Sequence, residues 1–206
     1  FYLGGEVIPN MNRLAIANSA ELKQLNHVIA VGNTDRRKNI RGLLAAWQMA
    51  LITNPHLRLH LVGPGLGAGD SLAKEFDSKF EYGQVTWHGS IDRRELSNLY
   101  SRCKVLVHPS LHESFGLIYL EAFAGNLGVI AFAKSGSAAE VLGDAGLILE
   151  DDSTKSLSDA ILNLTSNQTL LNQLTENGRA RLEKYSPNLV TRMYISLYER
   201  TIGILN

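Results

Sequence analysis

The sequence predicts a single α/β domain built on a doubly wound parallel sheet. Short apolar runs alternate along the chain with segments whose apolar residues recur at helical spacing. Several of the runs end in glycine or proline, which is typical of strands that stop at a loop. Strands separated by helices run parallel and are joined by right-handed crossovers. In such a sheet, ligands bind beyond the carboxyl ends of the strands.

Six short apolar runs are interpreted as buried strands. The first ends at Gly32, and the second alternates apolar and polar residues before it reaches Gly63. The fourth is closed by Pro109. The predicted strands cover residues 27–32, 57–62, 84–88, 104–108, 128–132 and 146–149.

Helical patterns fill the segments between and after these strands. Asp92 followed by Glu95 predicts a capping box at the start of one helix. Asn126 stands at the end of another, where it can take the left-handed conformation. Trp47 and Trp87 fall on helix and strand patterns and are expected in the core. The predicted helices cover residues 39–52, 70–81, 92 onward, 115–125, 137–142, 155–165, 168–184 and 187–203.

The composition limits the classes of function. Of the 206 residues, 45% are hydrophobic and 19% charged, which excludes a disordered chain. Twenty basic residues balance twenty acidic ones, so no nucleic-acid partner is expected. No apolar stretch reaches the roughly 18–20 residues of a membrane-spanning helix. The single cysteine, Cys103, cannot form an intrachain disulfide and fits a reducing compartment such as the cytoplasm.

A cationic turn follows the first predicted strand. Arg36, Arg37 and Lys38 stand at the entrance to the helix at 39–52, where the helix N terminus disfavours each cation by roughly 0.3–1 kcal/mol. A bound phosphate would compensate for this repulsion. The alternative is a solvated loop in which Asp35 pairs with one of the arginines. The residues themselves leave both alternatives open.

Glycines crowd the turn after the second predicted strand, Gly63-Pro-Gly-Leu-Gly-Ala-Gly69. It is not a P-loop, because no Gly-Lys-Ser/Thr follows. Glycines such as Gly63 allow a ligand to approach the backbone closely. The alternative is an ordinary flexible turn.

Two carboxylates mark residues 107–124. Glu113 precedes a helix start at Phe115 and Gly116, where free N–H groups suit a phosphate or a sugar hydroxyl. Glu121 lies inside an apolar helix, and a buried carboxylate needs a partner. A ribose diol would satisfy Glu121; the alternatives are partial exposure or pairing with a lysine or arginine. For Glu113 the alternative is simple stabilisation of the helix N terminus.

Other chemistries find little support. Pro109 lies between His108 and His112, so these two histidines cannot form a helical metal pair, and no metal site is expected. The Gly-x-Ser-x-Gly motif of a nucleophile elbow is absent. Cys103 has no paired base nearby in the sequence and is interpreted as a packed thiol.

In this order, the segments resemble the C-terminal, donor-binding half of the retaining GT-B glycosyltransferases of the GT4 family. The most specific segment runs from Glu113 to Glu121, matches the family's Glu-x7-Glu signature and follows a Pro-Ser loop. Residues 31–39, 61–65 and 85–89 match as well. The resemblance extends from about Val28 to the C terminus. It implies a Rossmann-like sheet that forms one half of a GT-B fold.

The resemblance also implies a nucleotide-diphospho-sugar as donor, with no metal or other cofactor. Glu113 matches the catalytic carboxylate that faces the transferred sugar. Lys38 and Arg37 match the catalytic cations that hold the diphosphate. Glu121 matches the ligand of the ribose hydroxyls. The other donor-binding positions that the resemblance implies are Ser114, Phe115, Gly116, Leu117, Gly63, Gly89 and Ile91.

One departure from the family concerns the diphosphate. Asn33 stands where many relatives carry arginine, so the contact rests on Arg37 and Lys38. A turn with threonine followed by Arg-Lys-Asn occurs in some mannosyl- and rhamnosyl-type relatives, which is compatible with GDP-mannose.

The resemblance leads us to expect one donor domain, residues 1–206, with an irregular lead-in at 1–25 and without the family's N-terminal acceptor domain. Such a domain binds its nucleotide but is inactive alone. In the whole protein it serves retaining transfer of a hexosyl group to a saccharide or lipid-linked acceptor, as in polysaccharide biosynthesis. The apolar stripe of the last predicted helix is a candidate contact with the absent domain. The expected location is cytoplasmic; peripheral association with the inner face of a membrane stays open.

Two alternatives remain. The first is a GT-B nucleotide-sugar epimerase, which would release an epimerised sugar nucleotide without any acceptor. The second is a non-catalytic nucleotide-binding module with a vestigial cleft, against which the presence of Lys38, Glu113 and Glu121 argues.

Overall fold

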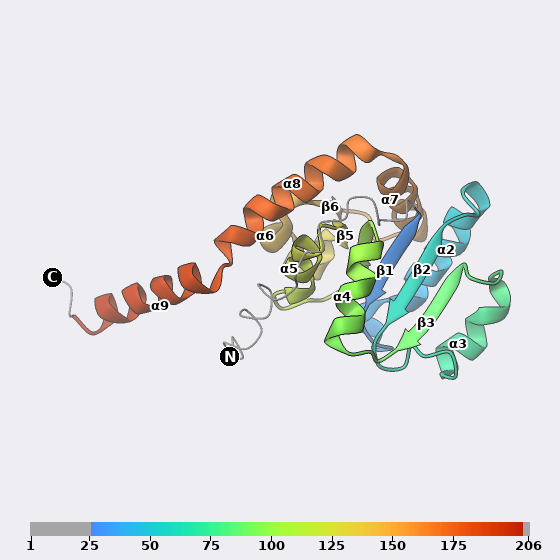
Figure 1. The fold of residues 1–206 in the computed structure, drawn as a ribbon, viewed down its shortest axis with the longest axis horizontal. Coiled ribbons are helices and arrows are strands. Elements are labelled where there is room, and N and C mark those ends of the chain that lie inside the picture. Colours follow the sequence, from blue (N-terminus) through green and yellow to red (C-terminus); the bar gives the residue numbers. More distant parts are fainter. Residues whose placement is uncertain (1–25, 204–206) are drawn as a thin grey trace.

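The computed structural model describes residues 26–203 and contains a six-stranded, fully parallel sheet (Figure 1). Its strand order is β3-β2-β1-β4-β5-β6, so the chain moves outward in one direction from β1 and then in the other from β4. The strands are β1 (His27–Val31), β2 (Arg58–Val62), β3 (Val85–Gly89), β4 (Val105–His108), β5 (Gly128–Phe132) and β6 (Gly146–Leu149). The predicted fold class is therefore confirmed, and the lead-in predicted at 1–25 lies outside the described residues.

The register places β1 between β2 and β4, with Ile29 beside His60 on one side and Leu106 on the other. The loops that follow β1 and β4 therefore leave the same edge of the sheet from neighbouring strands. This is the point where the direction of strand addition reverses, and in parallel α/β sheets it is where ligands bind.

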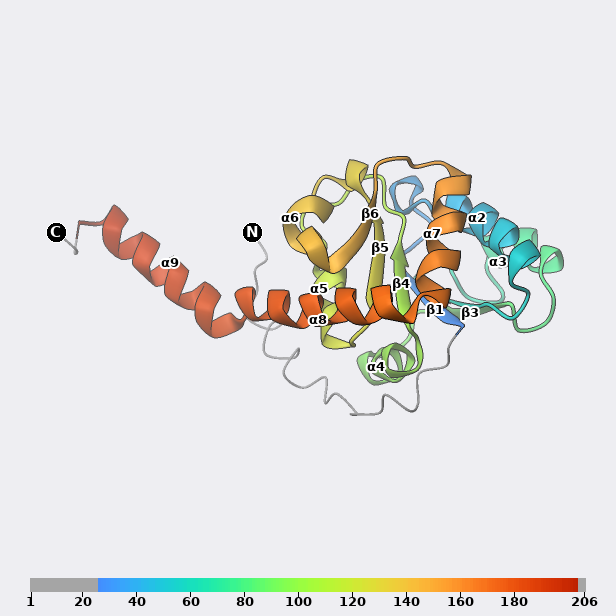
Figure 2. The same cartoon turned by 90° about the horizontal axis from the view of Figure 1, so that it is seen from above.

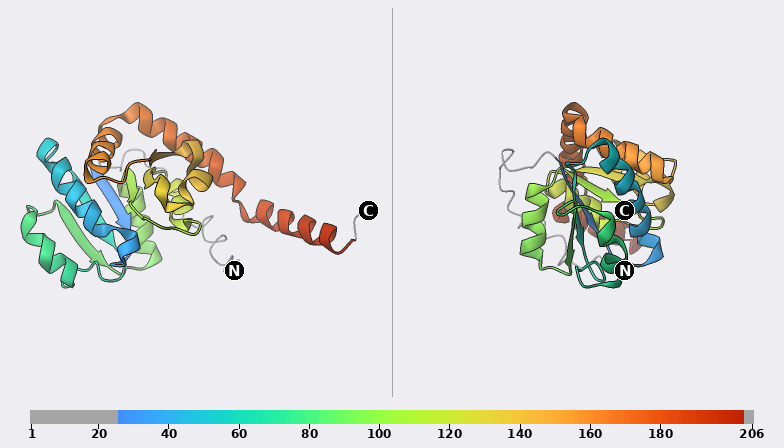
Figure 3. Two further views of the ribbon diagram at one scale, coloured as in Figure 1. Left: turned by 180° about the vertical axis from the view of Figure 1, so that it is seen from behind. Right: turned by 90° about the vertical axis from the view of Figure 1, so that its right-hand side faces the viewer.

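Helices cover both faces of the sheet (Figures 2 and 3). One apolar cluster packs a sheet face against three helices: α2 (Ile40–Thr53), α3 (Ser71–Phe76) and α7 (Thr154–Ser166). A second cluster packs the other face against α4 (Arg93–Arg102), α5 (Leu117–Ala124) and α6 (Ala138–Leu142). The long helix α8 (Gln168–Lys184) adds Leu171 and Leu174 to the first cluster.

The predicted core residues lie in these clusters. Trp47 is fully buried on α2, and its indole N–H donates to the carbonyl of Gln84. Trp87 is buried on β3. The thiol of Cys103 is buried in the second cluster, as predicted.

Most element boundaries differ from the predictions by one or two residues, and two helices show where the differences come from. The helix predicted at 70–81 is α3, which ends at Phe76 and continues only as a 3-10 turn, Asp77–Lys79. The helix predicted at 115–125 begins at Leu117, because Gly116 is left-handed with φ 82°. The predicted capping box of Asp92 and Glu95 is present, and Asn126 has φ 58°, also as predicted.

The last helix, α9 (Pro187–Thr201), projects away from the domain and buries none of its residues (Figure 1). Its predicted apolar stripe is exposed: Met193 and Tyr198 are each 62% exposed. Within residues 26–203, no helix combines the length and the apolar character needed to cross a bilayer.

Three histidines form a hydrogen-bonded row across β1, β2 and β3. His27 Nδ1 lies 2.8 Å from His60 Nε2, and His60 Nδ1 lies 3.0 Å from His88 Nε2. Burial lowers the pKa of all three rings, that of His60 to about 4; the charge of Arg102 on α4 also lowers them, while Glu95 opposes the shift at His88. No cluster of histidine, cysteine, aspartate or glutamate in the described chain is arranged to hold a metal ion.

This row makes stability depend on pH. Because the folded-state pKa of His60 lies below the ordinary value near 6.5, the unfolded chain binds protons first as the pH falls. We expect His60 alone to lower the free energy of unfolding by up to about 1.4 kcal/mol per pH unit between pH 6.5 and 4, the limit for one proton. Urea denaturation across this range measures the slope. His60→Leu should flatten it, whereas the same change at exposed His56 should not; an equal slope in both variants would contradict the assignment.

Candidate functional site

A cavity of about 440 Å³ lies between the loop after β1 and the loop after β4. Most of the residues singled out from the sequence meet in it. Lys38 comes from the loop after β1, Glu113 from the loop after β4, and Glu121 from the interior of α5. The cavity is lined by Val31, Lys38, His108, Glu113, Ser114, Phe115, Gly116, Leu117, Ile118 and Glu121.

Glu113 is the centre of the polar contacts in this cavity. Its Oε2 atom lies 2.6 Å from Nζ of Lys38 and 3.1 Å from Nε2 of His108. The side chains of Lys38 and Glu113 are 25% and 16% exposed, so the ion pair is partly shielded from water. The predicted cation and the predicted carboxylate thus form one unit.

The surroundings of Glu113 keep it ionised. The hydrogen bond from His108 lowers its pKa to about 2; burial raises it, and Lys38 lowers it again by hydrogen bonding and by charge. Near neutral pH, Glu113 is therefore an acceptor for hydroxyl or ammonium donors and has no proton to give.

Backbone contacts fasten the two loops to each other. The carbonyl oxygen of Arg37 accepts the N–H of Leu111 at 2.7 Å and the hydroxyl of Ser110 at 3.2 Å. The N–H of Glu113 donates to the carbonyl of Ser135 at 2.8 Å. The positions of Lys38 and Glu113 are therefore fixed by hydrogen bonds of the neighbouring backbone as well as by their ion pair.

Helix α5 begins at the wall of the cavity. Gly116 stands at its N-cap with φ 82°, and a Cβ there would meet the Tyr119 ring at 2.4 Å, so glycine is required. The Tyr119 N–H donates to the carbonyl of Gly116 at 2.9 Å, whereas the N–H groups of Leu117 and Ile118, the first two residues of the helix, have no partner within the helix. Because Leu117 and Ile118 also line the cavity, these donors and the positive end of the helix dipole border it.

Glu121 also lines the cavity. Burial raises its pKa, and this is opposed by the Tyr100 hydroxyl, which donates to Oε2 at 3.1 Å, and by the charge of Arg93. Glu121 is thus partly exposed, as one alternative expected, and has a protein partner, although not the lysine or arginine that was also considered. The Glu121 carboxylate can accept further hydrogen bonds besides this one, and a ligand could donate them.

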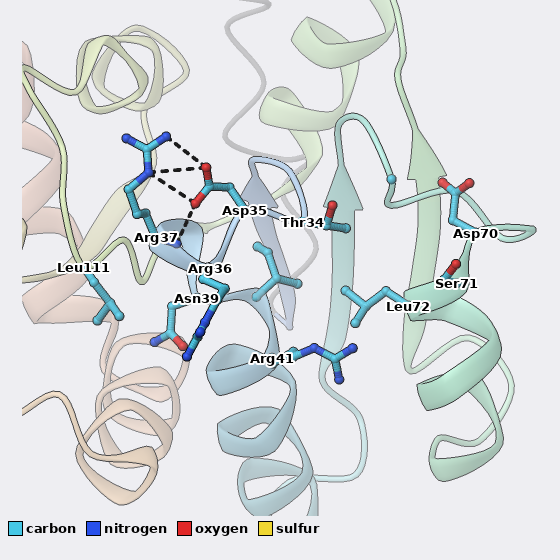
Figure 4. Close-up of a pocket in the computed structure, with 12 residues that line it drawn as sticks. Thr34, Asp35, Arg36, Arg37, Asn39, Arg41, Asp70, Ser71, Leu72 and Leu111 are labelled. Atoms are coloured by element: carbon cyan, nitrogen blue, oxygen red, sulfur yellow. Dashed lines mark hydrogen bonds and ion pairs between the residues drawn. The ribbon is translucent and has the colours of Figure 1, made fainter.

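Arg37 does not join this group. Its guanidinium pairs with Asp35 at 2.9 Å, as the alternative interpretation of the turn expected, and it holds the pKa of Asp35 at about 2. Arg37 lines a neighbouring cavity of about 560 Å³, together with Arg36 and Arg41 (Figure 4). In this structure only Lys38 of the cationic turn contacts Glu113.

The remaining predicted positions lie at the ends of β2 and β3. Gly63 donates its N–H to the carbonyl of Gly89 at 2.8 Å, and Gly89 donates to that of Leu66 at 2.9 Å. Ile91 packs against the same apolar cluster as Leu117. None of these three positions lines either of the two cavities described above. Where Gly63 was expected to admit a ligand, the carbonyl of Gly32 occupies the space: a Cβ on Gly63 would lie 1.8 Å from it.

Two residues of the site were not identified from the sequence. His108 was considered only as a metal ligand, yet it contacts Glu113. Its signal was its position as the last residue of a strand, before the Pro-Ser loop. Tyr100 lies on α4 and reaches Glu121 across the sheet face; no sequence signal pointed to it.

Comparisons with known proteins agree with this arrangement. The family model described as "Glycosyl transferases group 1" matches residues 13–181. The O-antigen chain mannosyltransferase B of Escherichia coli is 28% identical over 188 residues, which cover 90% of this chain and 49% of that protein. The chain therefore spans about half the length of this curated relative.

Solved structures show the same fold. The C-terminal domain of a glycosyl transferase group 1 family protein, LpcC from Francisella tularensis, superposes with a TM-score of 0.65 at 23% identity, over 78% of this chain and 87% of that one. Anabaena Alr3699/HepE in complex with UDP-glucose superposes with a TM-score of 0.70 at 19% identity, over 98% of this chain and 53% of that one. At this identity the likeness concerns the fold, one half of the GT-B architecture.

Proposed function

The chain belongs to the glycosyl transferases group 1 family, and from this membership we propose that it binds the nucleotide-diphospho-sugar donor of a retaining hexosyltransferase. The observation that carries the proposal is the convergence of Lys38, Glu113, the start of α5 and Glu121 on one cavity at the reversal point of the sheet. Had Lys38 and Glu121 lain at opposite ends of the sheet, no single ligand could reach both.

The cavity offers a partner for each part of such a donor. Lys38 has three N–H donors, of which Glu113 takes one, so the others can reach a diphosphate. The amides at the start of α5 suit phosphate oxygens. Glu121 can accept from the ribose hydroxyls, and Glu113 from a hydroxyl of the transferred sugar.

The proposed chemistry follows from where charge develops. When the bond between sugar and diphosphate breaks, negative charge grows on the leaving nucleoside diphosphate. A fixed cation and a helix N terminus directed at that charge stabilise the transition state more than the ground state. We propose that Lys38 and the first turn of α5 fill this role, with no metal or other cofactor.

The acceptor side of the reaction is also a proposal. We propose that an N-terminal acceptor-binding domain completes the enzyme, that the exposed apolar face of α9 contacts it, and that the described domain alone does not transfer sugar. The acceptor would be a saccharide or a lipid-linked saccharide, by analogy with the O-antigen relative. We also propose a cytoplasmic location, since nucleotide-sugars and a single cysteine, which cannot form an intrachain disulfide, suit a reducing compartment.

Calorimetry against UDP, GDP, ADP and their sugar conjugates tests the donor proposal. We expect the nucleoside diphosphate of one of the three bases, and its sugar conjugate, to bind without added metal. GDP-mannose is the first conjugate to test. Failure of all three nucleoside diphosphates to bind would contradict it. Release of an epimerised sugar nucleotide, without any acceptor, would instead establish the epimerase alternative.

Removal of the Glu121 carboxylate should weaken only ligands that carry a ribose diol. We expect Glu121→Ala to reduce affinity for the ribonucleoside diphosphate by about 10- to 100-fold, since hydrogen bonds to a charged group contribute about 1.5–3 kcal/mol each. Affinity for the 2′,3′-dideoxy form should stay within about two-fold. Isothermal titration with both ligands measures the difference. Glu176→Ala, at an exposed position of α8, is the matched control, and equal losses for the two ligands would contradict the ribose assignment.

A further inference from the structure

The two oxygens of the Glu113 carboxylate are in different situations. Oε2 accepts from both Lys38 and His108. No group in residues 26–203 donates to the other oxygen, Oε1. Since Glu113 lines the cavity, one oxygen is held by the protein and the other is left for a ligand.

His108 is held more rigidly than Lys38. It is the last residue of β4, its register partner on β5 is Ala131, and it is 3% exposed. Its ring and the ring of Tyr119 form a T-shaped pair, with a centroid distance of 5.4 Å and an interplanar angle of 86°. Lys38, by contrast, carries a flexible four-carbon side chain.

The direction of the His108–Glu113 bond follows from the carboxylate. An ionised carboxylate only accepts hydrogen bonds, so the Nε2 atom of His108 must carry a hydrogen and donate it to Oε2. A histidine that donates in this way orients its acceptor whether or not a cation is also present.

We propose that His108 is a positioning residue that holds Oε2 of Glu113 so that Oε1 faces a hydroxyl of the transferred sugar. The inference rests on the proposed function. It explains why one oxygen has two donors: when Lys38 turns toward the diphosphate, His108 still fixes the carboxylate. Without His108, the free Glu113 could rotate about its last bond, and the sugar contact would lose its geometry.

The consequence is specific to the sugar. Loss of His108 should weaken the binding of the nucleotide-sugar and leave that of the nucleoside diphosphate nearly unchanged, because the diphosphate and ribose contacts involve other residues. A purely structural residue would weaken both ligands alike.

The test compares three variants of the chain by calorimetry, with the best-bound nucleoside diphosphate and its sugar conjugate. His108→Leu should lower affinity for the conjugate about 10-fold and that for the diphosphate less than about 2-fold. His108→Gln, whose amide N–H can take the place of Nε2–H, should restore most of the loss. His112→Leu, in the same loop but exposed and outside the cavity, is the matched control and should change neither value.

A second measurement does not depend on any nucleotide. Carbon-13 NMR titration of the Glu113 carboxyl, assigned with Glu113→Gln, should show its pKa raised in His108→Leu and close to the wild-type value in His108→Gln. An unmoved pKa in folded His108→Leu overturns the proposal, and so does a raised pKa with equal losses for the two ligands. If the wild-type chain binds no nucleotide at all, the proposed function fails, and the NMR result alone then decides whether His108 holds Glu113.

Discussion

Replacement of Lys38 by alanine should reduce affinity for a nucleoside diphosphate by about 10- to 100-fold, because a charge-assisted hydrogen bond contributes about 1.5–3 kcal/mol. The change should hardly affect a nucleoside without phosphates, since Lys38 lies on the Glu113 side of the cavity and Glu121 is available for the ribose. Titration calorimetry with the two ligands measures both values on one protein sample.

Lys74→Ala is the matched control for this experiment. Lys74 is exposed on α3, lines neither cavity, and should bind the diphosphate like the wild type. If Lys38→Ala weakens nucleoside and nucleoside diphosphate equally, Lys38 supports the cavity rather than the diphosphate. Thermal denaturation of each variant separates that outcome from a loss of fold.

Gly63→Ala is expected to destabilise the fold by about 3 kcal/mol or more, a size typical of backbone strain combined with overpacking. Gly63 has φ 131°, a conformation that side chains rarely adopt, and a Cβ would lie 1.8 Å from the carbonyl oxygen of Gly32. Because that oxygen belongs to the backbone, it cannot move aside without disturbing the hydrogen bond that the Gly32 N–H donates to the carbonyl of Val62. Urea denaturation measures the loss.

Gly69 provides the control for this substitution. It lies in the same glycine-rich loop, and a Cβ there would meet no atom within 4 Å. Gly69→Ala should therefore change the free energy of unfolding by less than about 0.5 kcal/mol, as is usual for surface substitutions. Similar losses in both variants would mean that the loop tolerates no side chain for a reason other than the approach to Gly32.

Most of the fold could be predicted because local pattern and packing agree. The strand at 128–132 and the helix at 168–184 were predicted with the bounds that the structure shows, since each is a continuous apolar or amphipathic run between clear end signals. The helix predicted at 70–81 was too long. The helix ends at Phe76, which packs in the first apolar cluster, and the next three residues form only a 3-10 turn, which the sequence pattern did not distinguish from a longer helix.

The candidate site was predicted in part for the same reason. Lys38, Glu113 and Glu121 follow strands or stand on a helix beside the sheet's carboxyl edge, so topology alone brings them together. The sequence left open whether the cations of this turn face a bound phosphate or whether one arginine pairs with Asp35. Only the structure shows that Arg37 forms the ion pair with Asp35. The reach of Tyr100 to Glu121 depends on how α4 packs against the sheet, and a sequence contains no direct record of that packing.

One carbonyl oxygen, that of Arg37, joins the two segments that border the cavity by accepting both the Leu111 N–H and the Ser110 hydroxyl. The binding site is therefore preorganised: a ligand meets loops that are already fixed, and little of the binding free energy is lost in ordering them. Natural variation at position 110 would then affect ligand binding indirectly, because it would weaken the connection between the loops that follow two neighbouring strands without changing any residue that contacts the ligand.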